Sequence, residues 1–295
     1  MKKFSPSKIL IPVDFSKTSL KAIKHGAFIA KLNKGELILL NVQKKTDLID
    51  VIFPAFKLKD FTIITDYLNS KLQTLVADVK KEFGIKVTSL VSLGNITSEI
   101  VSIAEENEVE MIVMGTHGGD SQSSLMLGSN AYRVIAKTNC PVITIRANTH
   151  VLGYKNIVMP IDTTSHSRQK VLATLEFAEK FAAKIHLLGI LAKDEKDEKP
   201  KMEFVLKQIQ DSAKKRKLIT TVTIVETDDA SHKIIKFAAK HKADLISIMS
   251  DQEGGASKLL GQFSHHIIHD SKIPVMTFKP VINEVTDLGS FGGLW

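Results

Sequence analysis

The segment from Met114 to Ala131 carries residue types and a spacing that are typical of an anion-binding loop. Gly115 and Gly118 stand three positions apart, and a Gly-Ser pair follows after nine intervening residues at Gly128 and Ser129. Glycine tolerates positive φ and lets the backbone approach a bulky anion. A helix that opens at this Gly-Ser pair would point its first N–H groups at that anion. The pattern therefore indicates a cradle for phosphate.

Two further side chains could act on a ligand held there. Asp14 follows the first apolar run, where a carboxylate could accept from a ribose hydroxyl or from an adenine edge. His117 lies inside the loop, and because no acid–base partner is visible, contact with a ligand is the favoured interpretation. The segment from Met114 to Ala131 contains no Lys or Arg. Since electrostatic stabilisation is usually the largest catalytic contribution, this favours holding a ligand over fast hydrolysis of it.

Other nucleotide and metal patterns are weak or absent. The P-loop spacing Gly-x4-Gly-Lys-[Ser/Thr] does not occur, and the first apolar run ends without the Gly-rich turn of a dinucleotide fold. His265 and His269 are four apart, next to His266, and could share a metal. Their counterparts in the first half of the chain are not metal ligands. We therefore interpret them as an ordinary polar helix face and expect no metal site.

The chain contains an internal repeat. Four segments of the first half return in the same order in the second, the first two shifted by 148 residues: Lys8–Asp14 as Asn156–Asp162, Glu36–Val42 as Lys184–Ile190, Glu110–Met114 as Asp244–Met249, and Cys140–Ile145 as Ile273–Phe278. A period of this length indicates a duplicated domain rather than a solenoid. We therefore expect two domains, residues 1–150 with the intact motif and residues 151–295 with a degenerate one.

Each half alternates short apolar runs with amphipathic stretches. The runs, typical of strands buried on both faces, are Ile9–Val13, Leu37–Val42, Lys86–Val91, Met111–Met114, Val142–Ile145, Ile157–Ile161, Ile185–Ile190, Thr220–Val225, Leu245–Met249 and Val275–Phe278. The stretches of the first half predict helices over Ser19–Leu32, Tyr67–Phe83, Thr97–Asn107 and Ser129–Lys137. The alternation predicts an α/β fold of two tandem, doubly wound, five-stranded parallel sheets. Ligands of such sheets bind beyond the carboxyl ends of the strands.

Across both halves the sequence resembles the universal stress protein family. The nucleotide-binding branch of that family carries Gly-x2-Gly-x9-Gly-[Ser/Thr], which this chain matches, and the likeness extends to Pro12, Asp14, Val42, Met114 and Pro141. The resemblance implies an adenine-nucleotide alpha-hydrolase-like fold that binds ATP, with or without Mg²⁺. It implies an adenine pocket at Asp14 and the Val42 backbone, with phosphates on the loop amides. The binding residues that it implies are Pro12, Asp14, Val42, Met114, Gly115, His117, Gly118, Gly128, Ser129, Asn130 and Ala131.

The second half departs from this motif. When Met249 is aligned with Met114, three motif positions change: Gly115 becomes Ser250, Gly118 becomes Glu253, and Ser129 becomes Gln262. Glu253 would oppose the charge of a phosphate, although the neighbouring Gly254 and Gly255 leave a remodelled site open. We therefore expect one nucleotide site in each chain, in the first half.

Composition bounds the remaining function classes. The 295 residues are 43% hydrophobic and 24% charged, the ordinary globular mix. The net charge of +8 is spread along the chain and aromatic residues make up only 6%, so we expect no specific nucleic-acid binding. No apolar run reaches the ~18 residues of a membrane span, and no apolar signal core follows the N-terminus. With one cysteine, Cys140, expected to be packed and inert, we predict a cytoplasmic protein without a membrane partner.

The resemblance also bears on partners and function. It implies that the last strands, Val142–Ile145 and Val275–Phe278, pair edge to edge within one chain as a pseudo-dimer, and it leaves a further homodimer open. The apolar segment Leu48–Leu58 is interpreted as a flap on its own sheet, in preference to a cover for the other half or for an apolar ligand. The leading prediction is an ATP-holding, regulatory binding module of the stress response that acts through an unidentified protein partner. The alternatives are a slow ATP hydrolase and a protein-interaction scaffold without nucleotide.

Overall fold

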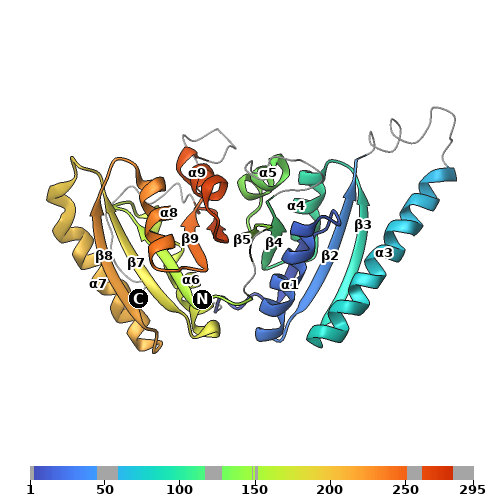
Figure 1. The fold of residues 1–295 in the computed structure, drawn as a ribbon, viewed down its shortest axis with the longest axis horizontal. Helices are drawn as coiled ribbons and strands as arrows, with labels where there is room; N and C mark the ends of the chain where they lie inside the picture. The colour runs from blue at the N-terminus through green and yellow to red at the C-terminus, as the bar shows by residue number, and fades with distance from the viewer. Residues whose placement is uncertain are drawn as a thin grey trace.

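The computed structural model describes residues 3–44, 59–116, 128–147, 149, 152–250 and 261–281, which build one ten-stranded sheet. Its order is β3-β2-β1-β4-β5-β10-β9-β6-β7-β8 (Figure 1). The strands are β1 Lys8–Pro12, β2 Glu36–Gln43, β3 Lys86–Leu93, β4 Met111–Gly115, β5 Val142–Ile145, β6 Asn156–Ile161, β7 Lys184–Leu191, β8 Thr220–Glu226, β9 Leu245–Met249 and β10 Val275–Phe278. Neighbouring strands are parallel within each half and antiparallel at the β5–β10 joint. The predicted α/β class is confirmed.

Helices cover both faces of the sheet (Figure 1). They are α1 Lys17–Leu32, α3 Lys59–Phe83, α4 Ile96–Glu106, α5 Ser129–Lys137, α6 Val171–Phe181, α7 Lys199–Lys215, α8 Ala230–Lys240 and α9 Gln262–Asp270, with single 3-10 turns η1 His166–Arg168 and η2 Lys196–Glu198. Helices α1, α3, α6 and α7 bury their apolar stripes on one face, and α4, α5, α8 and α9 on the other. Because both faces are covered, strand residues such as Ile9, Leu10 and Ile11 are fully buried in succession.

Capping side chains move the start of two helices from the predicted positions. Helix α1 begins at Lys17 because the Ser16 hydroxyl accepts from the Ser19 N–H at 3.2 Å. Helix α4 begins at Ile96 because the Asn95 side chain accepts from the Ser98 N–H at 3.2 Å. The prediction that Thr97 opens this helix was wrong, since Thr97 already lies inside it and is buried. The predicted ranges of α5, β5, β9 and β10 agree with the structure residue for residue.

The two halves join through their last strands, as predicted. Strand β10 runs antiparallel to β5, with Val275 opposite Thr144 and Thr277 opposite Val142. The Thr277 hydroxyl donates to the Val142 carbonyl at 3.2 Å. Beyond the strands, the buried Arg146 guanidinium donates to the Ile268 carbonyl of α9 at 3.0 Å. The joint therefore pairs two strands that would otherwise expose sheet edges.

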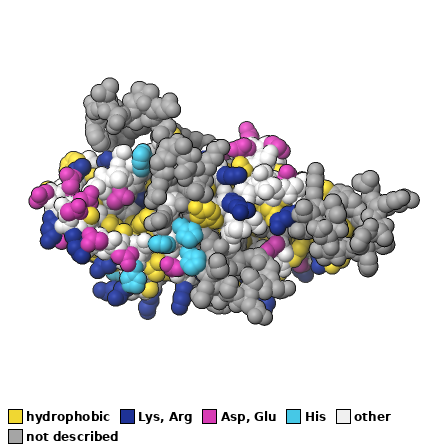
Figure 2. Space-filling view, turned by 90° about the horizontal axis from the view of Figure 1, so that it is seen from above, with side chains coloured by type: hydrophobic (Ala, Val, Ile, Leu, Met, Phe, Trp, Pro, Cys, Tyr) yellow, Lys and Arg dark blue, Asp and Glu magenta, His cyan; other side chains and the backbone are white. Residues whose placement is uncertain are grey.

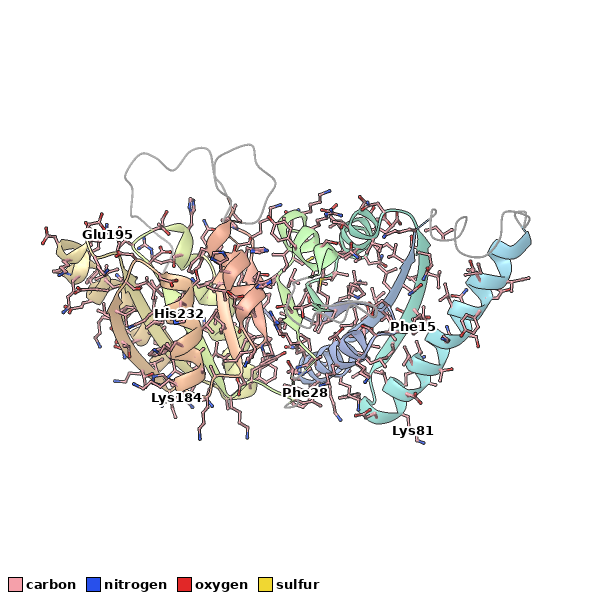
Figure 3. All side chains as sticks on the ribbon, turned by 45° about the horizontal axis from the view of Figure 1, so that its top comes forward. Phe15, Phe28, Lys81, Lys184, Glu195 and His232 are labelled. Carbon is pink, nitrogen blue, oxygen red and sulfur yellow. The ribbon has the colours of Figure 1, made fainter. Side chains whose placement is uncertain are left out.

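A ring cluster closes the same joint on the other face of the sheet. Tyr154, fully buried, contacts Phe177 and Phe181 of α6, with ring centroids 5.5 and 5.2 Å away. Phe28 of α1 reaches across to Phe181 at 6.0 Å, at the place where the two halves meet (Figure 3). His25 of α1 shares a hydrogen bond of 3.1 Å with the Tyr154 hydroxyl. Helices α1 and α6 are therefore packed together through aromatic side chains.

Acid should destabilise the chain through His25. Burial, with a smaller contribution from Lys21, lowers the pKa of His25 from 6.5 to about 4. Below pH 6.5 the imidazole of His25 is therefore protonated in the unfolded chain, whereas in the folded chain it stays neutral down to about pH 4. The free energy of unfolding is therefore highest above pH 6.5 and decreases as the pH falls. At pH 5 the loss should reach about 2 kcal/mol. Urea unfolding followed from pH 7.5 to pH 4.5 measures it.

The variant His25→Gln serves as the control because glutamine keeps a hydrogen-bonding side chain but has no proton to gain. Its unfolding free energy should fall by about 2 kcal/mol less than that of the wild type between pH 7.5 and pH 5. Equal pH profiles for the two proteins would contradict the assignment to His25.

Candidate functional site

The turn between β1 and α1 places a carboxylate at the carboxyl edge of the sheet. The Val13 N–H donates to the Leu40 carbonyl at 2.7 Å, which extends the β1–β2 ladder up to Asp14. Asp14 is exposed, and its Oδ1 accepts from the Ser16 N–H at 3.0 Å. Between them, Phe15 has φ +61°, a left-handed conformation that costs a non-glycine residue about 1–3 kcal/mol. Figure 3 labels Phe15, which also packs against the core. The left-handed Phe15 and the hydrogen bond from the Ser16 N–H therefore define the turn that carries Asp14.

A buried amide holds the end of β1 in place, and sequence reasoning missed it. Asn41 is 2% exposed, and its Nδ2 donates to the Val13 carbonyl at 2.7 Å. Gln43 Nε2 donates in turn to Asn41 Oδ1 at 2.7 Å. The available signal was a single amide inside the apolar run of β2, since a buried amide needs partners. At the equivalent position the second half has Gly189, against which α7 packs.

Gly115 ends β4, and the reason for glycine there differs from the predicted one. The described glycines with positive φ are Gly84 and Gly153, so Gly115 has no positive φ. A Cβ on Gly115 would lie 2.9 Å from both Cβ and Oγ1 of Thr18. The expectation that Gly115 serves through positive φ was therefore wrong. Glycine lets the first turn of α1 pack directly on β4.

The two ends of the motif loop meet at the start of α5. The Thr116 carbonyl accepts from the Gly128 N–H at 2.6 Å, and the Thr116 N–H donates to the Ile145 carbonyl at 3.0 Å. Helix α5 begins at Ser129, as predicted, with Gly128 as its N-cap. Because the Gly128 amide is engaged, an anion at this helix terminus would meet the amides of Ser129, Asn130 and Ala131. His117 and Gly118 lie outside the described residues.

The sheet order brings the described site residues to one edge. Strands β2, β1 and β4 are neighbours and parallel, so their carboxyl ends lie side by side. Pro12 and Asp14 come from β1 and its turn, Val42 from β2, Met114 and Gly115 from β4, and Gly128, Ser129, Asn130 and Ala131 from the start of α5. An exposed carboxylate and a helix N-terminus thus share the edge at which ligands of parallel sheets bind.

The sheet register corrects the alignment of the second half by one residue. In the first half Gly115 pairs with Ile145, the last residue of β5, and in the second Met249 pairs with Phe278, the last residue of β10. The residues just before these strands give the same alignment. The Asp244 N–H donates to the Asn156 carbonyl, just as the Glu110 N–H donates to the Lys8 carbonyl. Met249, rather than Ser250, therefore occupies the position of Gly115. The loop residues Glu253, Gly254 and Gly255 lie outside the described residues.

The histidines of α9 contact the first half through an aromatic ring. His265 and His269 stack with ring centroids 5.8 Å apart, and Tyr132 of α5 meets His265 at 5.4 Å. Figure 2 shows histidine side chains gathered near the middle of this side of the molecule. His269 Nδ1 lies 2.5 Å from Asp270 Oδ1. Within the described ranges no group of three His, Cys, Asp or Glu side chains is arranged to hold a metal.

Cys140 and the described helices bear on two further expectations. Cys140 is half-buried, and burial raises the pKa of its thiol, which disfavours the reactive thiolate. Among the described residues, no helix combines the length and the apolar character that crossing a bilayer requires. The segment Leu48–Leu58, interpreted as a flap, lies outside the described residues.

Comparison with known proteins agrees with this architecture. The family model of the universal stress proteins matches residues 6–146 and again residues 153–279. Universal stress protein MJ0577 of Methanocaldococcus jannaschii is 35% identical over 152 residues, 47% of this chain and 94% of that protein. MJ0531 of the same organism is 34% identical over 142 residues, 47% of this chain and 81% of that protein.

A solved structure resembles the whole chain. The crystal structure of a universal stress protein from Archaeoglobus fulgidus DSM 4304 has a TM-score of 0.77 and 19% identity, and the match covers 94% of this chain and 99% of that one. Each half of the sheet is parallel and doubly wound, and a helix begins at its carboxyl edge after the fourth strand. This arrangement defines an α/β protein of the adenine-nucleotide alpha-hydrolase-like class. The chain belongs to the universal stress protein family, with two family domains in tandem.

Proposed function

We propose that this protein is an ATP-binding regulatory module of the stress response in the cytoplasm, with its nucleotide site in residues 1–150. The observation that carries the proposal is the hydrogen bond of 2.6 Å from the Gly128 N–H to the Thr116 carbonyl. It ties the N-terminus of α5 to the end of β4, next to the β1 turn that presents Asp14. Helix N-terminal amides suit phosphate, and a carboxylate suits ribose hydroxyls.

In this proposal Asp14, Val42 and the start of α5 have defined parts. Asp14 accepts from the ribose, the backbone at Val42 lines the adenine pocket, and the first amides of α5 hold phosphate oxygens, with Ser129 donating its hydroxyl. The motif residues His117 and Gly118 complete the loop in this proposal. Mg²⁺ that accompanies ATP would be held mainly by the phosphates and water, as is usual for this ion. Residues 151–295 form the second domain, without this site.

Mass spectrometry of the purified, denatured chain tests the proposal directly. Retained ATP is expected, and isothermal titration calorimetry of the stripped protein should give one ATP site in each chain. Retained ADP or AMP would instead indicate turnover. Two equivalent ATP sites in each chain, or no heat of binding at all, would contradict the assignment to the first half.

A further inference from the structure

Strand β8 forms one edge of the ten-stranded sheet and, within the described residues, pairs only with β7 (Figure 1). The Ile185 N–H donates to the Ile219 carbonyl, and the Thr227 N–H donates to the Leu191 carbonyl. Odd-numbered residues of β8 therefore direct their backbone groups to β7, and even-numbered residues direct theirs outward. The residues whose N–H and C=O groups point away from the sheet are Thr220, Val222, Ile224 and Glu226.

The sequence of β8 suits pairing with a further strand. Edge strands are commonly protected from such pairing by lysine or proline, and β8 contains neither. Every residue of Thr220–Val225 is β-branched, which favours an extended strand. Val222 is 38% exposed, and Ile219, directly before the strand, is 69% exposed. The opposite edge strand, β3, begins with Lys86. Of the two sheet edges, β8 is therefore the one better suited to pairing.

Opposite charges flank β8 at its two ends. The residues Lys214–Lys217 before the strand read Lys-Lys-Arg-Lys, and Glu226, Asp228 and Asp229 stand at its end. A second copy of β8 that ran parallel to the first would place like charges side by side. An antiparallel copy places each basic end against an acidic end, so the charges favour this direction.

The charged groups at both ends are accessible to a partner. The exposed lysines that form no salt bridge within the described ranges are Lys214, Lys215 and Lys217. Glu226 and Asp228 pair with Lys196 and Lys193 at 3.7 and 2.8 Å. Both pairs are exposed, and because such pairs contribute little to stability, their carboxylates can exchange partners.

One antiparallel register uses the whole strand. When Thr223 of one copy faces Thr223 of a second copy, Val222 lies opposite Ile224, and Thr220 lies opposite Glu226. The outward N–H and C=O groups of these opposed residues then meet as the hydrogen-bonded pairs of an antiparallel ladder. Val222 and Ile224 form apolar cross-strand pairs. Because this register is the same for both copies, the interface is two-fold symmetric and closes as a dimer.

We propose that two copies of this chain associate through their β8 edges, antiparallel and centred on Thr223, to form one continuous sheet. The pairing has the same direction as the one that joins β5 to β10 within the chain. The basic end Lys214–Lys217 of each copy lies against the acidic end of the other. Because the strand is short, the interface belongs with those below ~1,200 Å², which are typical of weak, reversible complexes.

Sedimentation velocity of the full chain tests the association. The mass should rise from one chain to two between ~1 and ~200 µM protein in ~20 mM salt, the range of a weak complex. Raising the salt to ~500 mM should weaken the dimer at least about tenfold, since the flanking charges are then screened. A chain that stays monomeric, or a mass that grows beyond two chains as in open pairing of β8 with β3, would overturn the proposal.

Two proline variants locate the interface. Val222→Pro removes an outward N–H and leaves the ladder to β7 intact, so the dimer should weaken at least about tenfold with an unchanged circular dichroism spectrum. The matched control is Ser89→Pro in β3. Because the Gly94 N–H donates to the Gln43 carbonyl, Ser89 directs its N–H away from β2, and this variant should dimerise as the wild type does. An unchanged dimer in Val222→Pro, or a dimer lost in Ser89→Pro, would contradict the assignment to β8.

Exchange of the flanking charges tests the antiparallel direction and leaves the outward N–H groups in place. One variant carries Lys214→Glu, Lys215→Glu and Lys217→Glu, and the other carries Glu226→Lys and Asp228→Lys. Each variant alone should dimerise at least about tenfold more weakly, because both ends of its β8 then carry charge of the same sign. An equimolar mixture should restore a dimer of one chain of each kind. A mixture that stays monomeric, or variants that each dimerise like the wild type, would overturn the proposal.

Discussion

The variant Ser129→Glu should lower the affinity for ATP at least about 100-fold. Ser129 is the exposed first residue of α5, so a glutamate fits there without repacking the core. A carboxylate about 5 Å from a phosphate charge would repel it by about 3 kcal/mol at an effective dielectric constant near 20, which corresponds to more than 100-fold in affinity. Calorimetric titration with ATP measures the loss.

The stability of this variant separates an effect on binding from an effect on folding. An acidic side chain in the first helical turn interacts favourably with the helix dipole, so the melting temperature of Ser129→Glu should not fall. The matched control is Gln262→Glu, since Gln262 is the first residue of α9 after Gly261, as Ser129 follows Gly128. This control should leave ATP binding unchanged. If Gln262→Glu lost the binding of ATP while Ser129→Glu kept its full affinity, the nucleotide site would lie in the second half.

The variant Gly115→Ala should destabilise the chain by about 3 kcal/mol. The added Cβ would lie 2.9 Å from the Thr18 Cβ and 3.1 Å from the Thr18 carbonyl carbon, and backbone cannot move aside cheaply. Overpacking of this kind typically costs about 1–3 kcal/mol, and the upper end applies because α1 must shift along β4. Urea unfolding measures the loss. A shift of the α1 N-terminus would also displace Asp14, so ATP binding should weaken in parallel.

The control for this prediction is Gly94→Ala, at a glycine whose added Cβ meets the flexible side chain of Glu99. Its cost should stay below about 1 kcal/mol. The double variant Gly115→Ala with Thr18→Gly should recover part of the stability, since the coupling between contacting residues is about 0.5–3 kcal/mol. If Gly115→Ala unfolds at the wild-type urea concentration, α1 does not pack on Gly115 as described.

The two halves differ at one strand position that faces the helix following the first strand of each half. Because Gly115 has no side chain, the first turn of α1 packs directly on the end of β4. The turn before α1 then places Asp14 at the same edge of the sheet as the start of α5. In the second half Met249 takes the place of this glycine, and the chain at the position of the α1 N-terminus forms the single turn η1, with α6 beginning at Val171. The equivalent edges of the two half-sheets therefore differ in how closely the following helix packs on the sheet.

Much of the fold was predictable because both faces of the sheet are covered. Mostly apolar runs such as Leu245–Met249 are typical of central strands that helices cover on either side, and the predicted limits of this run agree with β9. The start of α5 was predictable from the Gly-Ser pair. The pairing of β5 with β10 followed from the resemblance to a family whose members pair their last strands, and the structure adds its antiparallel register.

The errors arose where a contact joins residues that are distant in sequence. The role of Gly115 depends on Thr18, nearly a hundred positions earlier, and no local pattern shows that approach. The position of Met249 was displaced by one residue because apolar strand residues align almost equally well in neighbouring registers, and only the pairing with β10 decides between them. Asn41 drew no attention because its partner is a backbone carbonyl of another strand.

By itself the sequence determined the duplication, the strand–helix alternation, the family and the place of the glycine motif, because these depend on local residue types and their spacing. Tertiary structure alone decided that Gly115 serves helix packing, that Asn41 holds the end of β1, and that β8 lies at an edge of the sheet. These are properties of distances between segments that the chain brings together only when it folds. Such distances follow from the packing of whole helices on the sheet, which no single stretch of sequence encodes.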